Sequence, residues 1–162
     1  MTTILLLGGY GATGKSLARH LLARTDAKLI LAGRTLDKAK AFADELNDSR
    51  VTCARVDASD EASLASSLRG VESSTSLRPS LCLVASATTQ FTGQVARACL
   101  DAGADYLDIQ FGGNKLEALR ALEPEIQKAG RCFVTEAGYH PGLPSALVRY
   151  AATFLDSVES AV

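Results

Sequence analysis

A glycine-rich stretch near the start of the chain constrains its fold more than any other feature. Residues 8–16 read Gly-Gly-Tyr-Gly-Ala-Thr-Gly-Lys-Ser and follow an apolar run at residues 4–7. From Gly9 onward the stretch fits the dinucleotide-binding pattern G-x-G-x-x-G, and it also fits the mononucleotide P-loop pattern G-x-x-x-x-G-K-S. Both patterns require a buried strand, a tight turn and a helix whose first N–H groups face an anion. The two interpretations predict different functions, redox chemistry or nucleoside triphosphate hydrolysis.

Apolar strand-like segments alternate with amphipathic helical segments along most of the chain. Such alternation, with right-handed crossovers, predicts an α/β fold, a doubly wound parallel sheet (Rossmann) of six or so strands in three layers. Residues 1–136 are expected to form one nucleotide-binding Rossmann domain, and residues 137–162 a turn and a helix that follow it. Strands are expected at residues 4–7, 28–32, 51–56, 81–85, 106–109 and 132–134, and helices at residues 17–22, 36–47, 60–69, 95–102, 115–129 and 143–154.

Charge and hydropathy exclude several classes of partner. The 162 residues carry a net charge of −1, with no basic stripe and no run of like charges, so neither nucleic acid nor an anionic membrane is the expected partner. No apolar run reaches the roughly eighteen residues of a membrane span. The four cysteines stand singly in apolar segments, without the spacing of a metal site, and predict buried reduced thiols. A cytoplasmic location and no metal are therefore expected.

The acidic partner that a P-loop enzyme needs is weakly represented. Such an enzyme holds Mg²⁺ through an acidic residue at the end of a neighbouring strand. The well-formed strand at residues 81–85 ends in Ala-Ser-Ala-Thr, which has no carboxylate. Asp57 and Asp108 both end strands and stay open as Mg²⁺ partners. The P-loop interpretation is therefore weakened but not excluded.

The ribose-reading position favours a dinucleotide and selects its type. Arg34 follows the second predicted strand, at the distance from the glycines where dinucleotide-binding proteins carry a residue that contacts the adenosine ribose. An acidic residue there would accept a hydrogen bond from the free 2′-hydroxyl of NAD. A guanidinium cannot accept, but it can bind a 2′-phosphate with two hydrogen bonds. Arg34 therefore predicts NADP, with NAD less favoured, and Gly33 beside it permits close backbone approach.

The expected course of the cofactor follows from the carboxyl ends of the strands. Adenine is expected near the end of the third strand, the pyrophosphate on the glycine turn, and the nicotinamide at the tip of the fourth strand, where small residues let the ring approach. The predicted cofactor-binding residues are Gly9, Tyr10, Gly11, Ala12, Thr13, Gly14, Arg34, Asp57, Ala58, Ala85, Ser86, Ala87 and Thr88.

Candidate catalytic residues are few. None of the four tyrosines is followed by lysine at the fourth position, which excludes the Tyr-x-x-x-Lys pair of short-chain dehydrogenases. The remaining titratable candidates are His140 and Tyr139, in a proline-glycine turn, and Asp108. His140 could act as a general acid or base near neutral pH. A loop histidine bonded to backbone is the alternative interpretation.

Several motifs together resemble the NADP-binding domain of the saccharopine dehydrogenase (saccharopine reductase-like) family. The resemblance covers nearly the whole chain. At one point the chain departs from the family, which places Ala-Gly-Pro after the fourth strand where this chain has Ala-Ser-Ala-Thr. The matching segments are Gly8–Gly14, Leu31–Arg34, Val56–Asp60, Val95–Cys99, Gly103–Asp108 and Gly138–Pro144.

The resemblance implies NAD(P)-dependent hydride transfer between nicotinamide and a small molecule with a C–N or C–C double bond. It also implies a second, substrate-binding domain after the turn, often the interface of a homodimer. The chain stops where that domain would begin, so it is expected to be either an excised cofactor domain or a naturally short member. A non-enzymatic NADP-binding redox sensor is the alternative function, and a P-loop nucleotide hydrolase is the third.

Overall fold

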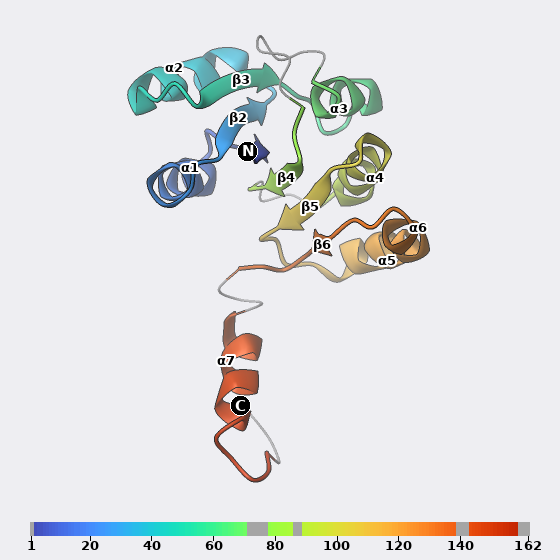
Figure 1. The fold of residues 1–162 in the computed structure, drawn as a ribbon. Helices are drawn as coiled ribbons and strands as arrows, with labels where there is room; N and C mark the ends of the chain where they lie inside the picture. Colours follow the sequence, from blue (N-terminus) through green and yellow to red (C-terminus); the bar gives the residue numbers. More distant parts are fainter. Residues whose placement is uncertain (1, 71–77, 86–88, 139–142, 159–162) are drawn as a thin grey trace.

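The protein folds around one parallel sheet, as the alternation of segments predicts. The structure is a computed structural model that describes residues 2–70, 78–85, 89–138 and 143–158. Its six described strands pair in the order β3-β2-β1-β4-β5-β6, all parallel (Figure 1). The strands are β1 (Thr3–Leu7), β2 (Lys28–Gly33), β3 (Val51–Arg55), β4 (Leu81–Val84), β5 (Asp105–Asp108) and β6 (Phe133–Val134).

This strand order is that of a dinucleotide-binding fold, and it confirms the Rossmann prediction. The strand β1 lies at the centre, paired with β2 on one side and β4 on the other, so the chain reverses its direction of growth there. The helices are α1 (Ala12–Arg24), α2 (Leu36–Leu46), α3 (Glu61–Leu68), α4 (Thr92–Ala102), α5 (Gly113–Ala121), α6 (Glu123–Lys128) and α7 (Leu143–Ala152).

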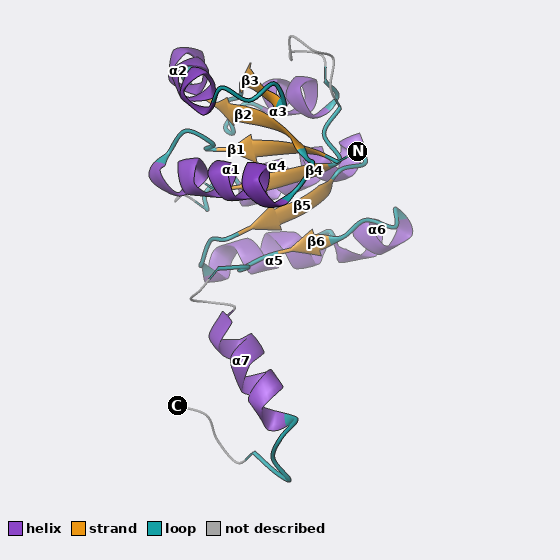
Figure 2. Cartoon of the chain, turned by 60° about the vertical axis from the view of Figure 1, so that its left-hand side comes forward, coloured by secondary structure: helices purple, strands orange, loops and turns teal. Residues whose placement is uncertain are grey.

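Two hydrophobic clusters, one on each face of the sheet, form the core. Successive side chains of a strand point to opposite faces, and β1 supplies both clusters in this way: Leu5 and Leu7 belong to one, Ile4 and Leu6 to the other. Helices α1 and α2 cover the second cluster, and α3 to α6 cover the first (Figures 1 and 2). This three-layer arrangement explains why the central strands β1, β2 and β4 are apolar at most positions.

One predicted helix is divided in two. The sequence predicts a single helix at residues 115–129, whereas the structure has α5 and then α6, which meet at Leu122. The cause is Pro124, because its ring lacks an N–H donor and fits only the first turn of a helix. The other differences are shifts of element ends.

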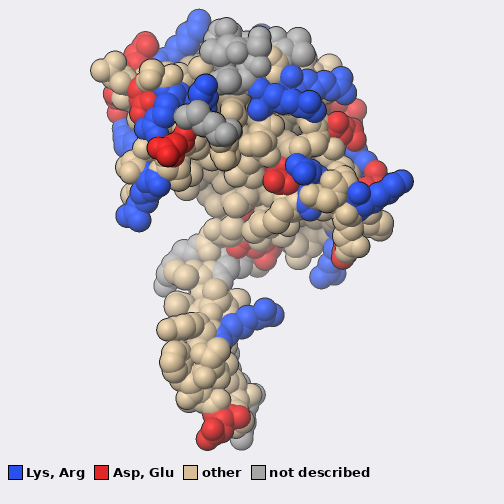
Figure 3. All heavy atoms as spheres, viewed as in Figure 1, with Lys and Arg blue, Asp and Glu red and all other residues tan. Residues whose placement is uncertain are grey.

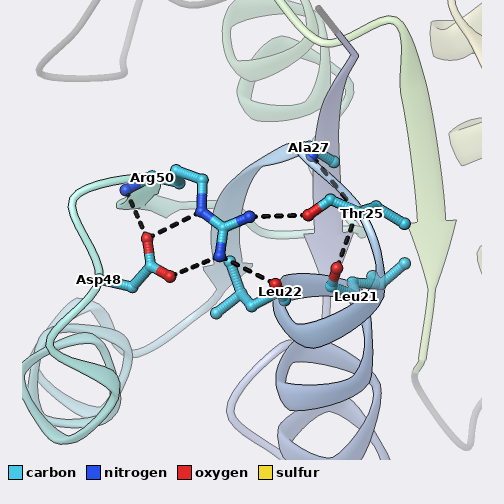
Figure 4. Close-up of polar contacts among 6 residues, drawn as sticks. All are labelled: Leu21, Leu22, Thr25, Ala27, Asp48 and Arg50. Atoms are coloured by element: carbon cyan, nitrogen blue, oxygen red, sulfur yellow. Dashed lines mark hydrogen bonds and ion pairs between the residues drawn. The ribbon is translucent and has the colours of Figure 1, made fainter.

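Arg50 joins three parts of the chain on the side of the fold where α1 ends. Its guanidinium donates to the backbone oxygens of Leu22 (2.9 Å) and Thr25 (2.7 Å), and to both carboxylate oxygens of Asp48 (3.0 and 2.7 Å; Figure 4). The carbonyl groups at the C-terminus of a helix have no partner within the helix. Arg50 therefore caps α1 and fixes the turn that leads into β3.

The helix α7 stands apart from the sheet (Figures 1 and 2). Charged side chains of both signs are spread over the visible face of the main body, whereas α7 is largely uncharged (Figure 3). Its large apolar side chains are exposed, among them Leu147 (55%) and Tyr150 (66%). In the described part of the chain, no helix combines the length and the apolar character needed to cross a membrane.

The first testable prediction compares two leucines in different surroundings. Leu6 is fully buried in β1, so Leu6→Ala leaves a cavity and lowers the free energy of unfolding by about 2–5 kcal/mol. The matched control Leu147→Ala, on the exposed face of α7, changes it by less than about 0.5 kcal/mol. Urea unfolding followed by circular dichroism measures both, and equal losses would contradict the assignment of the core.

Candidate cofactor-binding site

A cavity of about 680 Å³ lies over the carboxyl ends of β1 to β4. This is where a doubly wound sheet binds its ligand. Parallel strands bring the ends of distant segments to the same edge, so the glycine turn, the end of β2, the end of β3 and the start of α4 share one cavity. Its lining includes the predicted residues Tyr10, Gly11, Ala12, Thr13, Arg34, Asp57, Ala58 and Ala85.

The other two predicted glycines, Gly9 and Gly14, lie behind the cavity wall and do not line it. A Cβ atom on Gly14 would lie 2.7 Å from the Cα of Gly9 and nearer still to the carbonyl oxygen of Gly8. A Cβ on Gly9 would lie 2.9 Å from the carbonyl oxygen of Leu6. Both distances are shorter than real Cβ contacts, so these glycines let α1 pack directly against the end of β1. Gly8 has a φ of 83°, which favours glycine.

The N-terminus of α1 is suited to bind a phosphate group. Gly11 is the N-cap residue and has no side chain to accept hydrogen bonds from the first turn. Those N–H groups, and the positive end of the helix dipole, therefore face the cavity beside Ala12 and Thr13. The residues present fit the pyrophosphate of a dinucleotide.

Lys15 does not take the position that a P-loop lysine needs. Its Nζ atom lies 3.6 Å from Oε2 of Glu45 and 4.8 Å from the centre of the Phe42 ring, both on α2. It is not among the residues that line the cavity. The lysine thus contributes to the surface between α1 and α2, which argues against nucleoside triphosphate hydrolysis.

Arg34 and Asp57 lie at the end of the cavity near β2 and β3. Arg34 is exposed, and Asp57 is partly buried. The Asp57 Oδ1 atom accepts hydrogen bonds from the hydroxyl (2.7 Å) and the N–H (3.0 Å) of Ser59. These bonds are the main reason that the pKa of Asp57 lies below its ordinary value, and the positive charges of Arg34 and Arg55 lower it further. Arg34 and the ionised carboxylate of Asp57 therefore both line the part of the cavity where the adenosine is expected.

The opposite end of the cavity contains residues that the sequence did not indicate. The end of β4 supplies Ala85, as predicted, but Ser86, Ala87 and Thr88 lie outside the described residues. The start of α4, the β5 residue Tyr106 and the residue Gln110 after β5 complete the wall. A signal was available for α4, because a helix that follows a parallel strand begins at the cofactor edge of the sheet. The lining residues not foreseen here are Val84, Gln90, Phe91, Thr92, Val95, Tyr106 and Gln110.

Asp108, a predicted catalytic candidate, is fully buried at the end of β5. One carboxylate oxygen accepts from the Lys115 ammonium (2.6 Å), and the other accepts from the hydroxyls of Tyr106 (2.7 Å) and Thr135 (2.9 Å). The backbone N–H groups of Gln110 and Glu136 also donate to it. Asp108 therefore ties together β5, α5 and the segment after β6, as a charged group with its acceptor positions in use.

The path of the backbone after β6 depends on this network. Glu136 has a φ of 59°, which is uncommon for a residue with a side chain, and its N–H lies 3.2 Å from Oδ1 of Asp108. The next N–H, of Ala137, donates to the backbone oxygen of Asp108 at 2.9 Å. The other catalytic candidates, Tyr139 and His140, lie outside the described residues. Lys115, the partner of Asp108, carries no sequence signal that would mark it as buried.

The protonation of the network follows from its contacts. Burial by itself would raise the pKa of Asp108, but the ammonium of Lys115, the hydroxyl of Tyr106 and the further donors outweigh burial and hold that pKa below its ordinary value. Burial, together with the hydrogen bond to Asp108, raises the pKa of Tyr106. At neutral pH the network therefore contains an aspartate anion and a neutral tyrosine. Among the described residues, no group of three or more His, Cys, Asp or Glu side chains could hold a metal ion.

The second prediction concerns the buried charge pair. Asp108→Asn leaves the Lys115 ammonium without its counter-charge, and we expect the free energy of unfolding to fall by about 3–5 kcal/mol. The double variant Asp108→Asn/Lys115→Met recovers part of this loss, because no buried charge is left unpaired. Asp101→Asn, on the exposed side of α4, is the control and has little effect. Urea unfolding measures all three, and a double variant less stable than Asp108→Asn would contradict the pairing.

The third prediction is the acid dependence of stability. Because the folded-state pKa of Asp108 is lowered, its contribution is complete above the unfolded carboxyl pKa of about 3.9 and is lost as the pH falls through the folded-state pKa. Urea unfolding between neutral pH and pH ~3 is expected to show a steeper loss for the wild type than for Asp108→Asn/Lys115→Met. Parallel curves would show that Asp108 does not contribute in this way.

Comparison with known proteins identifies the family. The family model "Saccharopine dehydrogenase NADP binding domain" matches residues 4–134. Among solved structures, the chain is similar to apo saccharopine dehydrogenase (L-Glu forming) from Saccharomyces cerevisiae, with a TM-score of 0.77 and 24% identity over 95% of this chain and 31% of that one. It is also similar to biliverdin reductase from Synechocystis in complex with biliverdin and NADP+, with a TM-score of 0.62 and 17% identity over 93% of this chain and 43% of that one.

At these identities the solved structures establish the fold, and the family match establishes the kinship. The chain spans less than a third of the length of the yeast enzyme and less than half of the biliverdin reductase. The family match covers the glycine turn, Arg34 and Asp57, and the cofactor of this domain family is NADP. The chain belongs to the saccharopine dehydrogenase NADP-binding domain family.

Proposed function

We propose that this chain is the NADP(H)-binding unit of an oxidoreductase that transfers a hydride between the nicotinamide ring and a small molecule with a C–N or C–C double bond. The observation that carries the proposal is the continuous cavity, which has a phosphate-binding turn at its centre and Arg34 at one end. NADPH, when bound, would supply the hydride, and NADP+ would accept it in the reverse direction. The protein residues bind and orient it.

The lining supports a definite direction for the cofactor. The adenosine would lie beside Asp57 and Ala58, with its 2′-phosphate against Arg34, because this end holds the exposed guanidinium. The pyrophosphate would lie at the N-terminus of α1. The nicotinamide would then reach the opposite end, where Val84, Phe91 and other apolar side chains exclude water. Ser86, Ala87 and Thr88 remain proposed contacts of the nicotinamide.

The described lining of the cavity contains few side chains that could act as the acid or base of the reaction. Near the nicotinamide end, the titratable residue of the described lining is Tyr106. Its hydroxyl donates a hydrogen bond to buried Asp108, and the pKa of Tyr106 is raised. Asp108 is itself enclosed by donors. We therefore assign these two residues to positioning, and we keep His140 and Tyr139 as the proposed proton-transfer candidates.

A second domain is proposed to supply the substrate site. The exposed apolar side chains of α7 and of the turn after it, such as Leu147 and Phe154 (71% exposed), form a surface that water solvates poorly. The yeast enzyme contains much additional chain beyond the region matched here. We propose that residues 137–162 connect the cofactor domain to a substrate domain that covers α7 and also forms a homodimer interface. Substrate identity would then be determined outside this chain.

A redox sensor that binds NADP without turnover is the second candidate. The observation that favours it is the same scarcity of acid or base groups at the nicotinamide end of the described cavity. Substrate-dependent oxidation of NADPH by this chain alone, followed by absorbance, would exclude the sensor.

We also propose a cytoplasmic location. The four cysteines are free thiols; Cys82 and Cys99 are buried as predicted, whereas Cys53 is half-buried and Cys132 is exposed. The neighbouring thiol of Cys82, together with burial, raises the pKa of Cys99. Reduced thiols in such proximity are typical of a reducing compartment.

The fourth prediction tests the cofactor and its type. We expect the protein to bind NADPH more tightly than NADH, and Arg34→Ala to weaken NADPH binding about 10–100-fold, because a charge-assisted contact to the 2′-phosphate is lost. NADH, which has no 2′-phosphate, should be affected by less than about twofold. Titration calorimetry or nicotinamide fluorescence measures both constants.

The matched control for this experiment is Lys15→Ala. It removes a positive charge from the same glycine-rich segment, but from a side chain that contacts Glu45 and Phe42. Both dinucleotides should bind to this variant as to the wild type. Equal or tighter binding of NADH by the wild type would overturn the role of Arg34. Binding of Mg-ATP that Lys15→Ala abolishes would favour the P-loop interpretation instead.

A further inference from the structure

Tyr10 connects two parts of the cofactor site that are distant in sequence. It belongs to the glycine turn, yet its hydroxyl oxygen accepts a hydrogen bond from the N–H of Thr35 at 2.9 Å. Its ring lies over Gly33: a Cβ atom on that glycine would be 2.5 Å from the Tyr10 hydroxyl oxygen and 2.7 Å from two ring carbons. The space that a side chain at residue 33 would occupy is therefore filled by Tyr10.

These two contacts lie on either side of Arg34. Gly33 is the last residue of β2, and Thr35 is the N-cap residue of α2, whose own side chain makes no capping hydrogen bond. The backbone of Arg34 is thus held between a ring contact before it and a hydrogen bond after it. Its side chain is exposed, so the position of its backbone decides which part of the cavity the guanidinium can reach.

We propose that Tyr10 is a positioning residue for cofactor selectivity: by fixing residues 33–35 against the glycine turn, it holds Arg34 where it binds the 2′-phosphate of NADP. The inference rests on the proposed function. Because Tyr10 is part of the pyrophosphate turn, the contact also fixes the distance between the site of the pyrophosphate and the site of the 2′-phosphate. Both groups belong to one ligand molecule, so this distance influences whether they can bind together.

The fifth prediction uses Tyr10→Phe, which keeps the ring and removes the hydroxyl. We expect the dissociation constant of NADPH to rise about fivefold, as for the loss of one hydrogen bond. The constant for NADH should change by less than about twofold, because NADH makes no use of Arg34. The ratio of the two constants is the readout, since a general weakening of the fold would change both. Tyr150→Phe on α7 is the matched control and leaves both constants unchanged.

A second pair of variants tests whether Tyr10 acts through Arg34. In the Arg34→Ala background, Tyr10→Phe should cause no further loss of NADPH affinity, because the side chain that it positions is absent. Gly33→Ala should reproduce the selective loss, since its methyl group displaces the Tyr10 ring. The melting temperature of each variant, measured without cofactor, confirms that it is folded.

The outcomes separate this inference from the proposed function. If the wild type binds neither dinucleotide, the proposed function fails. If the wild type prefers NADPH and Arg34→Ala removes that preference while Tyr10→Phe does not, only the positioning role fails. Equal effects of Tyr10→Phe on NADPH and NADH, or an undiminished effect in the Arg34→Ala background, would also overturn it.

Discussion

The direct approach of backbone to backbone at Gly14 is the constraint on which the cofactor site depends. With no side chain on Gly14, the first turn of α1 rests against Gly8 and Gly9 at the end of β1. That contact brings the positive end of the helix to the carboxyl edge of the sheet, and it points the first N–H groups into the cavity. Because β1 pairs with both β2 and β4, its position also decides where the two halves of the cavity meet.

Two side chains connect the glycine turn and the sheet to other parts of the carboxyl edge. Tyr10 packs over Gly33 at the end of β2 and accepts a hydrogen bond from Thr35, on either side of Arg34. At the end of β5, the buried carboxylate of Asp108 accepts hydrogen bonds from Lys115 and from Thr135, which belongs to the segment after β6. A buried charge pair is costly unless its remaining positions are satisfied. The donors around Asp108 meet that condition, so this pair fixes where the chain leaves the cofactor domain.

Much of the fold was predictable because its signals are local. Continuous apolar runs indicated strands covered on both faces, and the helical periodicity marked the segments between them. The error at residues 115–129 came from giving the periodicity more weight than Pro124, whose ring ends a helix wherever it cannot occupy the first turn. At the site, the glycine spacing and Arg34 indicated the phosphate and ribose ends. Thr92 and Val95 were missed because no spacing links them to the glycine turn, although their place at the start of a helix after a parallel strand was a usable signal.

Local patterns specify the strand–turn–helix unit, the parallel sheet and the position of Arg34 after β2, since backbone geometry and side-chain periodicity act over a few residues. The direction of Lys15, which turns to Glu45 and Phe42, and the burial of Lys115 against Asp108 depend instead on how the whole chain folds. The same holds for Tyr10, which fills the space over Gly33. In each case the order of strands and the packing of helices bring the partner near, and no local pattern records that partner.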